Sequence, residues 1–279
     1  MTELDETVCC VLLISRYISD MIDIELKGVV KEFTRLDGSV IRAVAGVAIS
    51  IERGEVFGLL GPNGAGKTTT LRMISTVLSP TEGKILVRGI DSQDDSQGIR
   101  QIIGFLSGST GLYKRLTARE MIEYFGKLYG MSEDWLRERT DYLIEMLELG
   151  EYEKVLCEKL SAGNKQKVSI ARSIVHDPPV MVFDEPTTGL DVMIAENVLS
   201  FIESLKDTDK TMIFSTHIME EAERICDRIG LIQHGRILAC GTKDELFRSA
   251  SEIAGRNIPT LREVFMVYLS DSGMNGGLK

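Results

Sequence analysis

The spacing of apolar residues changes along the chain, and the changes predict an α/β protein. Residues 56–60, 180–183 and 211–215 are short, continuous apolar runs, as expected of strands buried on both faces of a parallel sheet. Segments with apolar residues at helical spacing follow these runs. Strands and helices that alternate in this way form a mainly parallel sheet covered by helices.

Two parts of the chain have different patterns. Residues 22–51 alternate apolar and polar positions, and the glycines between them predict short antiparallel strands. Residues 110–160 show only helical spacing, with a predicted capping box at Thr117 and Glu120 and a second helix capped by Ser132. The predicted fold is an α/β core with a mixed, mainly parallel sheet, an antiparallel β subdomain and a helical subdomain inserted at about residues 110–160.

The remaining elements follow from the same rules. Leu261, Val264 and Phe265 have the spacing of a helix that packs against a core. Further strands are predicted at residues 84–88, 229–233 and 236–240, and further helices at residues 94–102, 165–175, 219–226, 243–248 and 260–269, with another helix ending near residue 206.

The division into domains places the main domain at residues 21–250, with a C-terminal helix and tail at 251–279. Residues 1–20 are expected to be a loosely attached extension, or to be absent if Met21 is the true start, which mass spectrometry of the native protein would decide. The apolar run at 8–14 is much shorter than the ~20 residues that span a bilayer. It follows acidic residues where a signal peptide would be basic.

Composition narrows the possible functions. The 279-residue chain is 43% hydrophobic, which suits a packed core, and its formal charge of −10 argues against a dominant nucleic-acid surface. Its five cysteines form no Cys-x-x-Cys pair, so neither a disulfide framework nor a zinc site is predicted. Reduced thiols indicate a cytoplasmic protein.

A phosphate-binding loop lies between the predicted strand at 56–60 and the helix that follows. Its glycines allow the backbone amides to approach phosphate oxygens, Lys67 adds a positive charge, and the Thr68 hydroxyl can bind Mg²⁺. A glycine-rich turn could also serve geometry alone, but the eight-position motif in this context favours a nucleoside triphosphate site and an α/β core of the P-loop NTPase type. The residues predicted to bind the nucleotide here are Gly61, Pro62, Asn63, Gly64, Ala65, Gly66, Lys67, Thr68 and Thr69.

Two further candidates lie at the ends of buried strands. Asp184 and Glu185 follow the run at 180–183, where acidic groups are costly unless they meet a cation or accept a proton. Capping of the next helix is the simpler alternative. His217 follows the run at 211–215, and ligands gather at the carboxyl ends of strands in open α/β sheets.

Together these segments resemble the ATP-binding subunit of an ABC transporter over residues 22–269. The resemblance rests on the phosphate loop, the signature-like Leu-Ser-Ala-Gly-Asn at 160–164, and the strand ending in Asp184 with Glu185. It also includes the Asp-loop Gly-Leu-Asp at 189–191 and the switch His217. Within the family, residues 104–113 and 124–131 look like sodium-efflux subunits of the Nat type.

The resemblance implies catalytic roles for these residues. Lys67 and the loop amides would hold the phosphates of ATP, while Thr68 and Asp184 would bind Mg²⁺. Glu185 would polarise the attacking water, and His217 would hold the γ-phosphate.

The resemblance also implies that the site is composite. Ser161 and Gly163 of a second copy would cover the ATP in a head-to-tail dimer, and Asp191 would link the two sites. Phe33 would stack on the adenine, the alternative being a core or edge aromatic.

The implied function is ATP hydrolysis that drives export through a separate membrane permease, with this subunit on the cytoplasmic face of the membrane. Sodium is the expected substrate, and a drug or other small molecule is the alternative. A soluble ABC ATPase of translation or DNA maintenance would usually have two cassettes or a long coiled coil, and neither is found in the sequence. A nucleotide kinase or GTPase would not explain the ordered motifs.

Two positions depart from the family pattern. The signature has Ala162 and Asn164 where glycine and glutamine are usual, but Ser161 is kept, so we expect activity. Gly108 occupies the place of the usual metal-contacting glutamine. We hypothesise that Ser107 or Ser109 supplies an oxygen to the metal through a water molecule. The alternative is that this loop is only a hinge.

Overall fold

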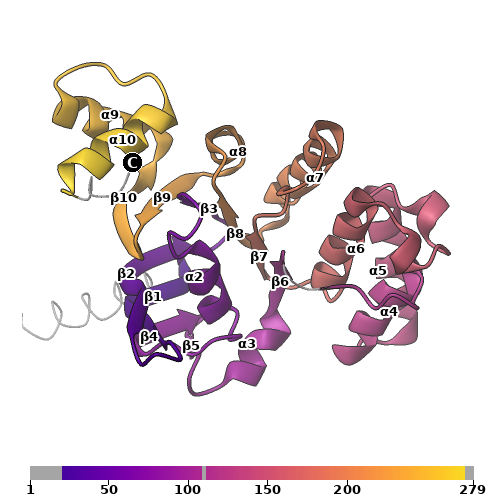
Figure 1. Ribbon diagram of the computed structural model, residues 1–279. Helices are drawn as coiled ribbons and strands as arrows, with labels where there is room; N and C mark the ends of the chain where they lie inside the picture. Colours follow the sequence, from indigo (N-terminus) through magenta and orange to yellow (C-terminus); the bar gives the residue numbers. More distant parts are fainter. Residues whose placement is uncertain (1–20, 109–110, 274–279) are drawn as a thin grey trace, which may run out of the picture.

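Two β-sheets and a group of helices make up the part of the chain that the computed structural model describes, residues 21–108 and 111–273 (Figure 1). The predicted extension at 1–20 and the end of the predicted tail, residues 274–279, lie outside it. The larger sheet has the order β10-β9-β3-β8-β7-β6, and all its neighbours are parallel except β9 and β10. Its strands are β3 (Val56–Leu60), β6 (Ile103–Ser107), β7 (Val180–Asp184), β8 (Thr211–Thr216), β9 (Arg228–Gln233) and β10 (Arg236–Thr242).

Helices cover the larger sheet, and its central strands separate two cores. Every residue of β3, β7 and β8 is buried, which explains their continuous apolar runs. Side chains such as Phe57 and Val182 pack toward α2 and the smaller sheet, while Met181 and Phe183 pack toward the helices of the other face. The helices after these strands are α2 (Lys67–Ile74), α7 (Val192–Ser204) and α8 (Met219–Ile225), and α3 (Ser96–Ile102) directly precedes β6.

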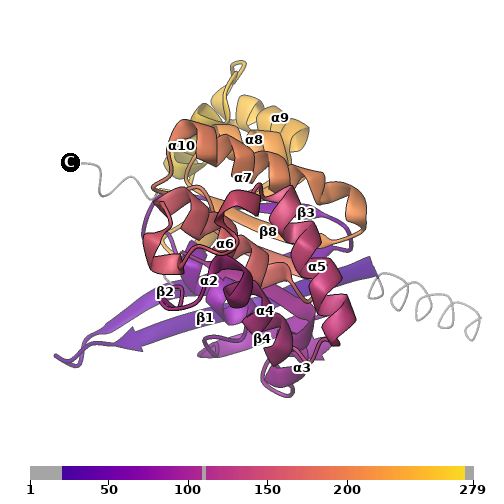
Figure 2. The same ribbon diagram turned by 90° about the vertical axis from the view of Figure 1, so that its right-hand side faces the viewer.

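The smaller sheet is antiparallel, with the order β2-β1-β4-β5. The short strands predicted at 22–51 are wrong, because β1 (Ile22–Thr34) and β2 (Val40–Glu52) each run for 13 residues. Gly28 and Gly46 lie at register shifts inside these strands, where their positive φ angles are accommodated. Figure 2 shows this strand pair projecting from the body of the molecule. The other strands are β4 (Glu82–Val87) and β5 (Ile90–Asp91).

Three helices lie together beyond β6 and β7 (Figure 1): α4 (Ala118–Leu128), α5 (Glu133–Met146) and α6 (Ala162–Ile174). The capping box of Thr117 and Glu120 is present, whereas the Ser132 side chain makes no capping hydrogen bond. Helix α6 begins earlier than predicted, because the Ser161 side chain caps it by accepting from the Asn164 amide. Short 3₁₀ turns occur at Gly150–Tyr152, Cys157–Lys159 and Lys206–Thr208.

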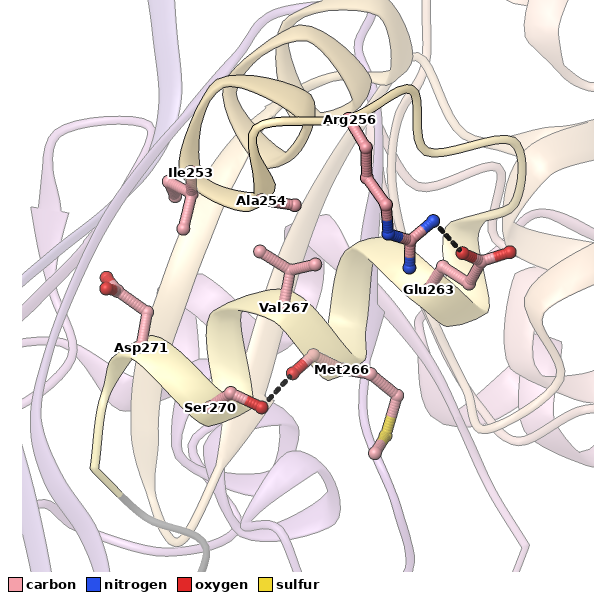
Figure 3. A pocket seen from close by; sticks show the side chains of 8 residues that line it. All are labelled: Ile253, Ala254, Arg256, Glu263, Met266, Val267, Ser270 and Asp271. Atoms are coloured by element: carbon pink, nitrogen blue, oxygen red, sulfur yellow. Dashed lines mark hydrogen bonds and ion pairs between the residues drawn. The ribbon is translucent and has the colours of Figure 1, made fainter.

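The chain ends in two packed helices, α9 (Lys243–Ala254) and α10 (Leu261–Asp271). Helix α9 runs past its predicted end at 248 and stops at Gly255, which has the left-handed conformation of a C-cap glycine. Figure 3 shows a cavity of about 470 Å³ between the two helices, with the Arg256–Glu263 ion pair beside it. Within residues 21–108 and 111–273, no helix is long and apolar enough to cross a membrane.

Candidate nucleotide-binding site

The phosphate loop is held tightly between β3 and α2. A Cβ atom on Gly61 would collide with the Ile232 carbonyl, and one on Gly66 would lie 2.6 Å from the Ala43 carbonyl oxygen. Gly66 also has φ of 108°, in the region that favours glycine. These glycines are therefore required by close backbone contacts that the sequence alone could not show.

Two neighbouring segments support the loop, and neither contact was predicted from the sequence. The Gly235 amide, in the turn between β9 and β10, donates to the Ala65 carbonyl at 2.8 Å. Ala43 is the extra residue at a register shift in β2, where its carbonyl faces Gly66 and Gly235. In the sequence, Gly235 was the one available signal for this supporting turn, because the turn's φ of 73° at that position favours glycine.

A cavity of about 400 Å³ opens over the loop at the N-terminus of α2. Amide groups and the positive end of the helix dipole make such a place suited to anions. The cavity is lined by Ala43, Asn63, Gly64, Gly66, Lys67, Thr68, Thr69 and Glu185.

Lys67 reaches back across its own loop. Its ammonium donates to the Gly61 carbonyl at 2.7 Å and to the Pro62 carbonyl at 3.1 Å, and lies 3.0 Å from Glu185 Oε1. The Lys67 side chain is only 3% exposed. Three oxygen partners therefore hold a buried positive charge at the base of the cavity.

Asp184 lies at the end of β7, beside the loop. Its Oδ1 accepts hydrogen bonds from Thr68 Oγ1 at 3.1 Å and from Ser215 Oγ at 2.9 Å. Burial raises the pKa of the Asp184 carboxyl above its usual value, against the effect of these hydrogen bonds. Ser215 was not predicted as a site residue, and its position follows from its register opposite Asp184 in the parallel β7–β8 pair.

Glu185 has a left-handed backbone, with φ of 48°, that turns its side chain toward Lys67. Its Oε2 accepts from Thr188 Oγ1 at 3.0 Å and lies 3.5 Å from His217 Nδ1. Burial raises the pKa of Glu185, but the hydrogen bond and charge of Lys67 outweigh it and hold the pKa below its usual value. Glu185 is therefore anionic at neutral pH.

Ser161, Gly163 and Asp191 do not line this cavity. Ser161 caps α6, and Asp191 caps α7 by accepting from the Ile194 amide at 3.0 Å. Ile194 also packs against Gly163 so closely that a Cβ atom there would collide with its side chain. Within one chain these residues have local structural tasks, and Ser161 and Asp191 are exposed.

Phe33 and the hinge also lie outside the cavity. Phe33 is paired with Ile41 near the tip of the β1–β2 pair, is 39% exposed, and has Lys31 Nζ 5.3 Å from its ring centre. Ser107 ends β6 in register with Asp184, and Gly108 follows it. Ser109 lies outside the described residues.

Comparison with known proteins agrees with this geometry. The sequence profile of a family described as "ABC transporter" matches residues 44–188. The chain belongs to the ABC transporter family. The ATP-binding protein NatA of Bacillus subtilis (strain 168) is 44% identical over 211 residues, 75% of this chain and 86% of NatA.

Other members of the ABC transporter family are also similar. The linearmycin resistance ATP-binding protein LnrL of the same organism is 37% identical, over 83% of this chain and 71% of LnrL. A dimeric structure of the ATP-binding cassette MJ0796, in a post-hydrolysis state bound to ADP and Pi, superposes with a TM-score of 0.73 at 29% identity, over 78% of this chain and 98% of that one. The predicted P-loop fold is confirmed, and this ABC protein is an ATPase coupled to transport.

The residues present fit ATP and Mg²⁺. The loop glycines leave backbone amides facing a cavity that any Cβ on Gly66 would disturb, and Thr68 and Asp184 offer adjacent oxygen atoms. Among the described residues, no group of three His, Cys, Asp or Glu side chains could hold a metal. Mg²⁺ is commonly bound by one or two protein oxygens together with phosphates, and Thr68 and Asp184 offer such oxygens.

Proposed function

We propose that this chain is the ATP-hydrolysing subunit of an export system, acting on the cytoplasmic face of the membrane through a separate permease. The observation that carries the proposal is the continuous contact from Lys67 through Glu185 to His217 at the edge of the sheet. This contact supports the proposal that a phosphate-binding cation, a carboxylate base and an imidazole act together at one cavity.

In this proposal each residue has one task. Lys67, Thr69 and the loop amides bind the phosphates, and Thr68 with Asp184 would hold Mg²⁺, which neutralises phosphate charge when bound. Glu185 orients the attacking water and accepts its proton, and His217 holds the γ-phosphate.

The second half of the site would come from another copy. Ser161 and Gly163 lie at the N-terminus of α6, where amides can meet the γ-phosphate of ATP bound to the partner. Exposed Val192 and Met193 follow the capping residue Asp191, and an apolar surface beside an exposed carboxylate suits an interface. The dimeric MJ0796 cassette supports this arrangement.

The helical group is the proposed contact with the permease. Tyr113 is 56% exposed and Tyr124 is 40% exposed, and their rings meet edge to face with centres 5.6 Å apart. These rings lie on the segment that follows the hinge, so a movement of the hinge would reach them directly.

Phe33 would stack on adenine if the tip of the β1–β2 pair closes over the nucleotide.

Sodium is the proposed substrate. Residues 104–113 and 124–131 resemble sodium-efflux subunits, and the similarity to NatA supports the same assignment. Export of a drug is the second candidate, supported by the similarity to a linearmycin resistance protein.

A reconstituted pair of this chain and the permease encoded beside it tests the assignment. Sodium should stimulate ATPase activity, while potassium at equal ionic strength serves as the control. If sodium has no effect and a drug stimulates hydrolysis, the second candidate replaces the first. A neighbouring gene without apolar spanning segments would count against transport through an adjacent permease.

A further inference from the structure

Glu221 of α8 joins two segments of the catalytic edge. Its Oε1 accepts a hydrogen bond from Thr187 Oγ1 and its Oε2 accepts one from Thr216 Oγ1, both at 2.6 Å. All three residues are buried, with exposures of 6% for Glu221, 5% for Thr187 and 2% for Thr216. A buried carboxylate that accepts two short hydrogen bonds fixes both donors firmly.

The two threonines flank the groups proposed to act on ATP. Thr187 follows Glu185 by two positions, and Thr216 immediately precedes His217. The Thr216 hydroxyl also accepts from the Ile218 amide at 3.0 Å, so it holds the backbone on both sides of the histidine. Glu221 therefore connects the turn that bears the base to the loop that bears the imidazole.

His217 depends on this connection because its own contacts are weak. Nδ1 lies 3.5 Å from Glu185 Oε2, which is too long for a strong hydrogen bond, and no other hydrogen-bond partner for Nδ1 is found in the described part of the chain. The ring position is then set mainly by the backbone. That backbone is anchored through Thr216 to Glu221.

We propose that Glu221 is a positioning residue for ATP hydrolysis. Its carboxylate holds the loop of His217 against the turn of Glu185, so that both side chains face the same γ-phosphate. Glu221 itself does not line the nucleotide cavity. The inference rests on the proposed roles of Glu185 and His217, and goes beyond them by naming what fixes their relative place.

Substitutions at Glu221 separate positioning from simple structural support. Glu221→Ala leaves two buried hydroxyl groups without their acceptor. Glu221→Gln keeps both contacts, because its amide oxygen accepts from one threonine while its NH₂ group donates to the hydroxyl oxygen of the other. Glu220→Ala is the matched control, since Glu220 is an exposed glutamate on the same helix.

Steady-state ATPase assays on the full chain should split kcat from KM. A small displacement of catalytic groups is costly, so we expect Glu221→Ala to lower kcat about tenfold or more, with KM for ATP changed less than about twofold. Glu221→Gln should stay within about threefold of the wild-type kcat, and Glu220→Ala should match the wild type. A rise in KM with unchanged kcat, or an unchanged kcat, would overturn the proposal.

A double-mutant cycle with His217→Ala tests the route of the effect. If Glu221 acts through His217, then adding Glu221→Ala to His217→Ala should lower the single-turnover rate less than about twofold further. An equal loss in both backgrounds would overturn the proposal while leaving the role of His217 intact. Wild-type activity in His217→Ala alone would instead remove the proposed role of His217, and the Glu221 inference with it.

Should Glu221→Ala fail to fold, Thr216→Val and Thr216→Ser give the same test. Valine removes the hydroxyl at nearly constant volume, whereas serine retains it. We expect the valine variant to lose kcat and the serine variant to keep it. Equal kcat in the two variants would contradict the proposal.

Discussion

The two halves of the proposed ATP site differ in how much of their structure a single chain supplies. At the carboxyl ends of β3, β7 and β8, buried polar groups are paired with one another: Lys67 with Glu185, and Thr68 and Ser215 with Asp184. At the N-termini of α6 and α7, Ser161 and Asp191 are exposed and satisfy only helix caps. One half is therefore preorganised within the chain, while the other, exposed half carries groups that the proposal assigns to the site of a second copy.

The largest effect should come from Glu185→Gln in the preorganised half. Loss of the proton acceptor should lower kcat about 100-fold or more, the scale of general-base contributions. ATP binding should be retained, because Lys67 and the loop amides remain. Rapid-quench assays measure the fall in kcat, and equilibrium nucleotide binding measures the affinity for ATP. A kcat within threefold of the wild type would contradict the proposed role of Glu185 as the proton acceptor.

Ser161→Asp tests the exposed half of the proposed site, at the N-terminus of α6. Asp caps helices as well as Ser, so α6 should remain intact, but its negative charge would face the γ-phosphate bound to the partner. We expect kcat to fall about tenfold or more, at an unchanged thermal midpoint. Ser161→Asn is the matched control that keeps the cap without the charge, and an equal loss in both variants would show that charge at this position does not matter.

The hinge lies between the two halves. If Ser107 and Ser109 supply an oxygen to Mg²⁺ through water, replacing both by alanine should raise the Mg²⁺ concentration for half-maximal activity about threefold or more. Titration of ATPase activity with Mg²⁺ measures this. An unchanged Mg²⁺ requirement would leave the segment as a hinge only.

The smallest effect is expected away from both halves, at His176. Its ring stacks on Tyr129 with centres 3.5 Å apart, and burial lowers the pKa of His176 to about 4. The unfolded imidazole has a pKa near 6.5, so it binds a proton between pH 6.5 and 4 while the folded one stays neutral. The stability that neutral, buried His176 contributes is therefore fully present above pH 6.5 and is lost as the pH falls toward 4.

Unfolding by urea at pH 7 and pH 5 measures this loss. For the wild type we expect a contribution from His176 of about 1 to 2 kcal/mol to the decrease. His176→Phe, which keeps an aromatic ring against Tyr129, should remove that contribution. His234→Asn removes an exposed imidazole, so the wild-type pH dependence should remain, and its loss there would contradict the assignment to His176.

The residues proposed from the sequence for the first half of the site lie close together in the structure, because each belongs to a short segment at the end of a strand. Asp184, Glu185 and His217 end strands, and parallel strands carry such residues to one edge. The partners that hold them come from other strands and turns, and Ser215, Thr188 and Glu221 became visible only when strand order and register were known.

The fold was predictable for the same reason, and the errors in the predicted elements have local causes. The buried runs at 56–60 and 180–183 have no other stable arrangement than a covered parallel sheet. Glycines were read as strand ends, yet Gly28 and Gly46 form irregularities inside continuous strands, because their positive φ angles absorb an extra residue. Ala43 lies at such an irregularity, and no sequence pattern indicates that its carbonyl meets the phosphate loop.

Mixing two impaired variants tests the composite site most directly. Lys67→Ala disables the phosphate loop and Ser161→Asp impairs the exposed half, so each homodimer should keep at most about a tenth of the wild-type activity. In a mixed dimer, one site would combine an intact loop with an intact Ser161 from the other copy. We expect an equimolar mixture to recover up to about a quarter of the wild-type ATPase activity, the share of intact sites under random pairing. No recovery, in mixtures shown to contain the mixed dimer, would contradict a site shared between two copies.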